Sequence, residues 1–247
     1  MHLPSLAAEL RDLSAAGGKI AQDLRRQKLV VEPKPDGSIV TNADCAVEDW
    51  LRPRLLNLAP NSTLWGEEGG HRVEGAGGLW VVDPIDGTTN FAFNSPMWGV
   101  SIALVQRGEI LAGAVCLPDL SETLYASKGG GVWMNERQLH CIKSGPIAPH
   151  EPVAYCQGVR RNSPGAKWPG KQRCSGAIVI DGTFFALGRV RGFIGVREML
   201  YDMAACALFG MELGADVRYA SGEPLSIADL CANVKIDQPW VMFPAGL

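Results

Sequence analysis

The run Asp83-Pro84-Ile85-Asp86-Gly87-Thr88-Thr89 combines residue types that suit the chemistry of a metal-bound phosphate. The apolar residues 79–82 before it predict a buried strand that ends at Asp83, and Gly87 with the two threonines predicts a helix start. Free N–H groups at a helix N-terminus bind phosphate, and Gly87 would let a ligand approach the backbone closely. The carboxylates of Asp83 and Asp86 would repel a phosphate dianion unless divalent cations lie between the carboxylates and the phosphate.

Magnesium is the cation that this pattern favours. It prefers oxygen ligands, keeps several waters, and is held by one or two carboxylates together with substrate phosphate. Two metals roughly 4 Å apart stabilise both the attacking and the leaving oxygen of an in-line displacement. The alternatives are local, with Asp83 as a turn residue before Pro84 and Asp86 as a helix N-cap. Both acids within one strand-turn-helix segment favour the metal site.

Further acidic residues fit the same site. Glu67 and Glu68 follow a short apolar strand, and only one of two adjacent side chains is expected to face the site, so Glu68 reads equally well as a solvated turn residue. Asp44 stands where a capping box would place an acid, which is the strong alternative to a functional role. Asp202 precedes the apolar helix predicted from Met203 to Leu213, so it is either a ligand or an N-cap.

Hydrophobic periodicity predicts the elements that position these acids. Apolar residues at helical spacing predict a first helix over residues 6–24, weakened at Gly17-Gly18, and a second helix that begins near residue 41. Two hairpins are predicted, over residues 100–117 and 124–134. A helix over residues 177–187 and the buried helix before Gly214 complete the pattern. This mixed order favours one α/β domain with two layers of sheet.

Composition excludes several classes of protein. The formal net charge of -3 argues against a dedicated nucleic-acid binder, and the basic stretch from Arg160 to Arg173 reads mainly as a solvated loop. Seven dispersed cysteines without a Cys-x-x-Cys argue against a disulfide framework or a zinc ribbon. No signal peptide and no apolar run of about 18 residues is evident, so we expect a cytoplasmic protein without a membrane span.

The chain resembles the inositol monophosphatase family in several separate blocks. The signature of the family matches closely from Asp83 to Phe91, and further matches occur at residues 66–68, 40–44 and 202–205. The resemblance implies an α/β (α+β) fold, a layered αβαβα sandwich of the inositol monophosphatase and fructose-1,6-bisphosphatase type. We expect residues 1–247 to form a single catalytic domain of two packed halves, roughly 1–120 and 121–247.

The resemblance also implies an activity. It predicts a metal-dependent phosphoric monoester hydrolase with two or three Mg²⁺ per active site, inhibited by lithium and assembled as a homodimer. The expected substrate is a small phosphorylated metabolite, such as inositol 1-phosphate, a sugar phosphate or histidinol phosphate, attacked by metal-activated water. The alternative is a regulatory protein that acts through a partner such as the transcription machinery, with phosphatase activity secondary.

The ligands of the metals follow from the same resemblance. One metal would be bound by Glu67, Asp83 and the backbone carbonyl of Ile85. A second metal would be bound by Asp83, Asp86 and Asp202. A weaker third ion would lie near Glu67.

Other roles are likewise implied by the resemblance. Thr88 and Asp44 correspond to a pair that would activate the attacking water, with Glu67 as an alternative base, and Asp44 would contact the third metal through water. Residues 34–41, which begin at Lys34, would form a lid. The expected substrate contacts are Gly87, Thr88, Asp86, Arg173, Gly176, Ala177 and Asp202.

Several positions depart from the pattern of the family. Tyr201 stands where tryptophan is usual, and Gly195 stands where a glutamate normally contacts the substrate, seven residues before the last metal ligand. Glu198 is close to that position but out of register. Arg191 replaces a usual acid, and with Arg173 it would favour a further acidic group on the substrate, the alternative being two surface arginines. These departures leave the predicted metal ligands intact and weaken any assignment to inositol.

Overall fold

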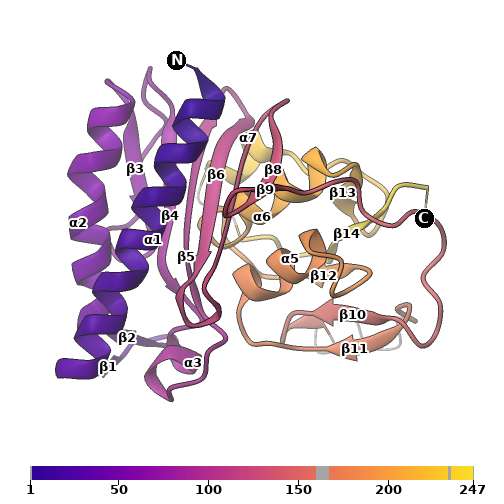
Figure 1. Cartoon of the computed structure of the whole chain (residues 1–247), viewed down its shortest axis with the longest axis horizontal. Helices are drawn as coiled ribbons and strands as arrows, with labels where there is room; N and C mark the ends of the chain where they lie inside the picture. Colours follow the sequence, from indigo (N-terminus) through magenta and orange to yellow (C-terminus); the bar gives the residue numbers. More distant parts are fainter. Residues whose placement is uncertain (1, 160–166, 233–234, 247) are drawn as a thin grey trace.

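The computed structural model describes residues 2–159, 167–232 and 235–246. Arg160 and Arg161, predicted to lie in a solvated loop, fall outside these residues. Two long helices, α1 (Leu3–Gln27) and α2 (Asn42–Leu58), cover one face of a seven-stranded sheet (Figure 1). Helices α5 (Ile178–Ala186) and α6 (Leu200–Glu212) lie between this sheet and a five-stranded sheet. The predicted layered α/β fold with two sheets is confirmed.

The seven-stranded sheet carries the first part of the site. Its order is β3-β4-β5-β6-β7-β8-β9, with β3 and β4 parallel and the other pairs antiparallel. Both predicted hairpins are confirmed, as β5–β6 and β7–β8. The strands are β3 (Thr63–Gly66), β4 (Leu79–Asp86), β5 (Gly99–Gln106), β6 (Glu109–Leu117), β7 (Glu122–Ser127), β8 (Gly131–Met134) and β9 (Arg137–Gln138).

The five-stranded sheet has the order β11-β10-β12-β14-β13. Its strands are β10 (Pro152–Tyr155), β11 (Lys171–Arg173), β12 (Phe193–Gly195), β13 (Ala215–Tyr219) and β14 (Trp240–Pro244). The remaining elements are β1 (Val31–Pro33), β2 (Ile39–Thr41), α3 (Thr88–Ala92), the 3₁₀ turn η1 (Pro118–Leu120) and α7 (Ile227–Leu230). Strands β1 and β2 pair as a small antiparallel hairpin.

The prediction that the β4 strand stops at Asp83 is wrong. The strand continues to Asp86, and its register against β5 shifts between these two residues. Pro84 lacks an N–H, so the ladder is irregular at this point without ending. The shift brings both carboxylates to the same end of one strand.

Helix α6 begins earlier than predicted. Its N-cap is Met199, so Asp202 is the third helical residue and does not precede the helix. The carboxylate of Asp202 accepts the N–H of Met199 at 2.6 Å, which stabilises the first turn. The cap at the other end is Leu213, and Gly214 follows with a φ of 80°. Because α6 contacts both sheets, it is apolar nearly all round.

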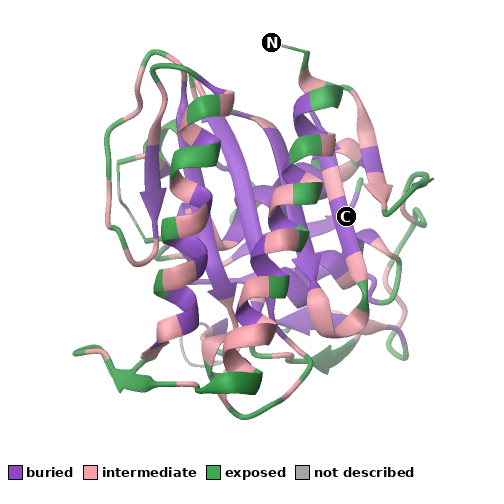
Figure 2. Cartoon of the chain, turned by 60° about the vertical axis from the view of Figure 1, so that its left-hand side comes forward, coloured by how far each residue is buried: buried purple, intermediate pink, exposed green. Residues whose placement is uncertain are grey.

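The buried residues are concentrated in the sheets and in the helices between them. Figure 2 shows the central strands of the seven-stranded sheet as buried, whereas α1 and α2 expose their outer faces. The four apolar residues of β4 before Asp83 have no exposed surface. All seven cysteines are free thiols, as predicted. Among the described residues, no helix is long and apolar enough to cross a membrane.

Helix α1 runs without interruption through Gly17 and Gly18, the position of the predicted weakening. Both glycines are buried, and a Cβ on Gly18 would lie 2.5 Å from Cγ of Pro118. Glycine at this position therefore lets the helix pack closely against η1 and the sheet.

We expect Gly18→Ala to destabilise the protein by about 1–3 kcal/mol through overpacking, although alanine is the better helix former. The measurement is the free energy of unfolding from denaturant titration. Ala15→Gly is the matched control, since residue 15 is exposed on the same helix and should lose only about 1 kcal/mol of helix propensity. A Gly18→Ala variant more stable than the wild type would contradict the close packing.

Candidate active site

Glu67 and Asp83 are brought together by two parallel strands. Gly66, the last residue of β3, pairs with Val82 of β4. Glu67 and Asp83 follow these two residues, so they lie at the same end of neighbouring strands. The N–H of Glu67 donates to the carbonyl of Val82 at 3.1 Å. The carboxylate of Asp83 accepts the N–H of Ile85 at 3.0 Å.

Asp86, the last residue of β4, contacts the inner helices, and Asp202 is carried by one of them. The carboxylate of Asp86 accepts the N–H of Val179 at 2.6 Å, in the first turn of α5. Helix α5 packs against α6, which carries Asp202 in its own first turn. One end of the seven-stranded sheet and the starts of two inner helices therefore meet at one place.

Burial and the charges of neighbouring acids raise the pKa values of Asp83, Asp86 and Asp202. Burial and then the charges of Glu67, Asp86 and Asp202 raise the pKa of Asp83 well above its usual range. Burial, followed by the charge of Asp86, also raises the pKa of Asp202 well above its usual range. Burial raises the pKa of Asp86 to about 7. Crowded carboxylates of this kind are stabilised by a bound cation, and their oxygen-only chemistry fits Mg²⁺.

Thr88 and Asp44 form a hydrogen-bonded pair beside these acids. The Thr88 hydroxyl lies 3.2 Å from Oδ1 of Asp44 and 3.0 Å from the carbonyl oxygen of Ile85, both as acceptors. The other oxygen of Asp44 accepts the N–H and the hydroxyl of Thr41 at 2.8 and 2.5 Å. The capping box read from the sequence is thus present, and Asp44 also contacts the site.

The backbone around Gly87 forms a tight turn between β4 and α3. Gly87 has a φ of 86° as the N-cap of α3, and a Cβ there would lie 2.9 Å from Cβ of Ala177. The amide of Asn90 donates to the carbonyls of Met97 and Ser175 at 2.7 and 3.0 Å. Asn90 therefore holds the segment that contains Gly176 and Ala177 against the start of α3.

Lys34 binds two acids of the site. Its ammonium group donates to Glu67 at 2.8 Å and to Glu68 at 2.6 Å. Lys34, a cation from the β1–β2 hairpin, therefore lies between the two adjacent glutamates. Glu48 of α2 accepts the N–H groups of Glu68 and Gly69 at 3.0 and 3.2 Å and so holds this loop in place.

The acids do not form a closed metal cage in this arrangement. Among the described residues, no three His, Cys, Asp or Glu side chains are grouped as ligands of one ion. Glu67 pairs with Lys34, while Asp83, Asp86 and Asp202 each accept a backbone N–H.

A cavity of about 200 Å³ opens beside Asp86 and Asp202. Of the predicted substrate contacts, it includes Gly176 and Ala177 as well as these two acids. Arg173 is exposed and lines a different cavity, so the structure does not bring it to this one. The lining residues are Asp86, Cys156, Gln157, Gly158, Gly176, Ala177, Ile178, Asp181, Val196, Arg197, Glu198 and Asp202.

Sequence comparison decides the family. The model of the inositol monophosphatase family matches residues 3–241. The chain belongs to the inositol monophosphatase family. It is therefore a phosphatase that hydrolyses phosphate monoesters.

Several members of the inositol monophosphatase family are similar to this chain. An inositol-1-monophosphatase of Mesorhizobium japonicum is 33% identical over 84% of this chain and 82% of its own length. The Nus factor SuhB of Pseudomonas aeruginosa is 32% identical over 89% and 86%, and a histidinol-phosphatase of Chlorobaculum parvum is 37% identical over 50% and 48%. The solved structure of an IMPase of Thermotoga maritima superposes with a TM-score of 0.81 at 24% identity, covering 94% of this chain and 89% of that one.

Both readings of Arg191 in this inositol monophosphatase homologue are wrong. The side chain is buried, so it is not a surface arginine, and it is not part of the cavity lining. It donates to Glu151 at 3.1 Å and to the carbonyls of Lys143, Ser144 and Gly145. Lys143 and Arg191 are among the donors that lower the pKa of Glu151 to about 2. Arg191 thus ties the connection before β10 to the second sheet.

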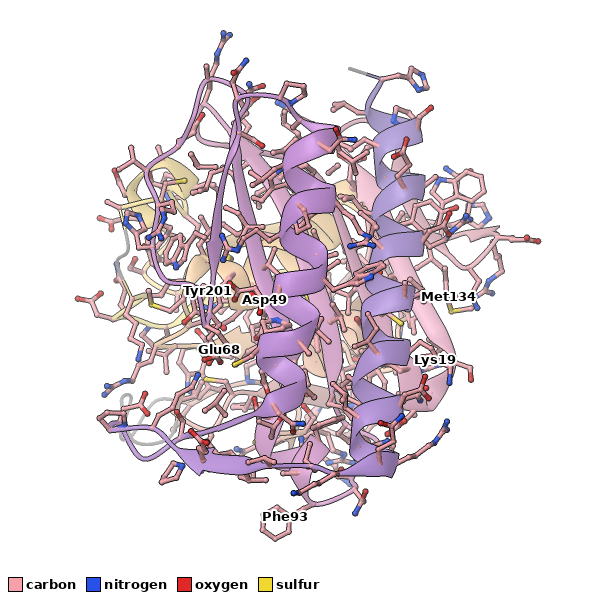
Figure 3. The ribbon with its side chains drawn as sticks, turned by 90° about the vertical axis from the view of Figure 1, so that its left-hand side faces the viewer. Lys19, Asp49, Glu68, Phe93, Met134 and Tyr201 are labelled. Carbon is pink, nitrogen blue, oxygen red and sulfur yellow. The ribbon has the colours of Figure 1, made fainter. Side chains whose placement is uncertain are left out.

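Tyr201, where this family usually has tryptophan, keeps an aromatic ring at the site. It packs edge-on against Trp65 with centroids 5.5 Å apart. Figure 3 shows it next to Glu68, and burial followed by the charge of Asp202 raises the pKa of its hydroxyl. The half-buried ring therefore lies close to the acids and packs on the apolar side chain of Trp65.

Three residues near the site were not identified as such from the sequence. The contact of Lys34 could have been inferred from two adjacent acids, which need a cation when they are partly buried. Glu48 had a signal in its spacing of four from Arg52, with which it pairs. Asp181, whose pKa burial raises to about 7, was visible as a single acid in an apolar helix.

Proposed function

We propose that the chain is a Mg²⁺-dependent phosphomonoesterase of a small phosphorylated metabolite, with residues 1–247 acting as a single catalytic domain. The observation that supports this proposal is that the ends of β3 and β4 and the first turn of α6 bring Glu67, Asp83, Asp86 and Asp202 into one region, where Asp86 and Asp202 line a cavity. The raised pKa values of Asp83, Asp86 and Asp202 and the oxygen-only chemistry of the four acids favour a hard divalent cation.

The four carboxylates and the carbonyl of Ile85 would hold the cations. When bound, Mg²⁺ would lower the pKa of a water and neutralise charge on the leaving oxygen. Gly87 and the N–H of Thr88 at the start of α3 would bind the phosphate oxygens. Gly176 and Ala177 would bound the same space, since Asn90 holds them there.

The Thr88–Asp44 pair supports a role in moving a proton. When the Thr88 hydroxyl donates to Oδ1 of Asp44, its oxygen lone pairs can accept a proton from the attacking water. Burial raises the pKa of Asp44, which makes its carboxylate a better proton acceptor. Glu67, bound to Lys34 here, is the alternative base. Arg173 is not supported as a substrate contact.

Several wider expectations belong to the same proposal. The similarity to proteins named inositol-1-monophosphatase and histidinol-phosphatase supports a substrate of that size, such as inositol 1-phosphate, histidinol phosphate or a sugar phosphate. We also expect inhibition by lithium, a homodimer and a cytoplasmic location.

The proposal is tested by assaying the purified protein with a panel of phosphorylated metabolites, with Mg²⁺ and with a chelator. We expect release of inorganic phosphate from at least one small phosphomonoester, and no release once the metal is removed. Turnover unaffected by the chelator would contradict the metal mechanism.

A regulatory role is the second candidate, because the chain is 32% identical to a protein named Nus factor SuhB. A protein that hydrolysed none of the panel but bound an RNA polymerase elongation complex in a gel shift would favour this role. Hydrolysis without such binding would exclude it.

A further inference from the structure

Residues 196–198 line one wall of the cavity, and the indole ring of Trp240 lies behind them, hydrogen-bonded to Glu198. Strands β12 and β14 lie side by side (Figure 1), and Gly195 of β12 pairs with Trp240 of β14. A Cβ on Gly195 would overlap Nε1 of Trp240. Trp240 has no exposed surface, and its ring packs on Phe193 with centroids 4.9 Å apart. No side chain can therefore enter the cavity from position 195.

A carboxylate from further along the chain takes the space beside this ring. Nε1 of Trp240 donates to Oε2 of Glu198 at 2.8 Å, and the N–H of Val196 donates to Oε1 at 2.9 Å. Glu198 is only 6% exposed, yet it lines the cavity that also contains Asp86 and Asp202. The proposed mechanism gives Glu198 no role.

The loop that carries Glu198 is held rigidly. The N–H of Arg197 donates to the carbonyl of Ile236 at 2.6 Å, and the N–H of Ile236 returns to the carbonyl of Glu198 at 3.0 Å. Sγ of Cys156 accepts the N–H of Val196 at 3.2 Å. Arg197 itself has a φ of 76°, a conformation that a non-glycine residue keeps only when its surroundings impose it. The carboxylate is therefore preorganised for a ligand.

The remaining hydrogen-bonding capacity of Glu198 defines that ligand. An ionised carboxylate accepts about four hydrogen bonds, and two N–H groups occupy part of this capacity. A carboxylate has no proton to donate, so a partner in the cavity must be a donor. A cationic donor gains more than a neutral hydroxyl, because charge-assisted bonds are roughly twice as strong and Glu198 itself is largely buried.

We propose that Glu198, positioned by Trp240, selects substrates whose alcohol part carries an ammonium group. This inference rests on the proposed phosphatase function and names the substrate class of the same site. The phosphate would lie at the acids and the start of α3, and the ammonium group would lie at Glu198. Arg197, the cation of this wall, is exposed at the rim, and so the competing expectation is a substrate with an anionic group.

Calorimetric titration with phosphonates tests the proposal, because their carbon–phosphorus bond cannot be hydrolysed. The ligands are propylphosphonate, 3-hydroxypropylphosphonate, ω-aminoalkylphosphonates with two to four methylenes, and 2-carboxyethylphosphonate, all with Mg²⁺. We expect the best aminoalkyl ligand to bind about tenfold or more tightly than propylphosphonate, with the carboxyethyl ligand weakest.

Two variants assign the preference to its residues. Glu198→Gln should reduce the preference for the aminoalkyl ligand to within about twofold of propylphosphonate, while the affinity for propylphosphonate itself stays within about twofold of the wild type. Trp240→Phe keeps a ring but loses the N–H, so we expect it to lose part of the preference. Circular dichroism confirms that each variant is folded.

The outcomes separate the two proposals. Equal affinities across the series, an undiminished preference in Glu198→Gln, or tightest binding of the carboxyethyl ligand would each overturn the role of Glu198. If the aminoalkyl preference holds but no phosphomonoester is hydrolysed, the binding site stands and the proposed phosphatase function fails. If phosphomonoesters are hydrolysed without any ammonium preference, only the substrate class fails.

Discussion

Asp86→Asn is expected to lose Mg²⁺-dependent phosphatase activity by at least about 100-fold while the protein remains folded. The substitution removes a charge that the proposed metal site needs, whereas the amide oxygen can still accept the N–H of Val179 that Asp86 binds at 2.6 Å. Because burial raises the pKa of Asp86 to about 7, the neutral amide should also increase the thermal stability of metal-free protein above that pH.

The measurement is the release of inorganic phosphate at saturating Mg²⁺, together with thermal unfolding in a chelator. Asp12→Asn is the matched control, since this exposed acid of α1 lies outside the site and makes only a surface pair with Arg11. It should keep wild-type turnover. An Asp86→Asn variant with the turnover of the wild type would exclude Asp86 as a metal ligand.

Metal-free protein is expected to become less stable as the pH rises from about 4 to about 7, and Mg²⁺ should reverse this loss. Asp83, Asp86, Asp181 and Asp202 all have a raised pKa in the folded state, chiefly through burial. Between the ordinary pKa of an aspartate and the raised one, the folded state binds more protons than the unfolded state. The free energy of unfolding must then fall as the pH increases.

Acids whose pKa is lowered in the folded state make the protein more stable as the pH rises, but they do so at lower pH. Glu151, with a pKa of about 2, and Asp119 contribute stability that is complete above the unfolded pKa of about 4 and is lost only below it. The interval from pH 5 to pH 7 therefore reports mainly on the buried aspartates.

Mg²⁺ at about 100 times its dissociation constant stabilises the folded state by about 2.7 kcal/mol, which corresponds to roughly 5–10 °C in Tm for a protein of this size. Thermal scans from pH 5 to pH 8, in chelator and in MgCl₂, measure both effects. Potassium chloride of equal ionic strength controls for screening. A Tm unchanged by Mg²⁺ at pH 8, or a Tm in chelator that rises between pH 5 and pH 7, would contradict the acidic metal site.

Much of this protein was predictable from local sequence. Helix α2 and both hairpins followed from hydrophobic periodicity and turn residues, because such signals depend on residues close together in the chain. Asp83, Asp86 and Gly87 were identified for the same reason, as one short segment holds the strand end, the acids and the helix start. The boundaries at Asp86 and Leu200 were wrong, since pairing with β5 and packing between the sheets decided them.

The sequence by itself determined the family and the set of acidic residues, because both are carried by residue types in short blocks. The tertiary structure alone decided the partners of those residues. Lys34 reaches Glu67 across 33 positions, Arg191 binds Glu151 across 40, and Trp240 binds Glu198 across 42. Such contacts arise only when sheets and helices pack, and no local pattern specifies which distant donor will meet a buried carboxylate.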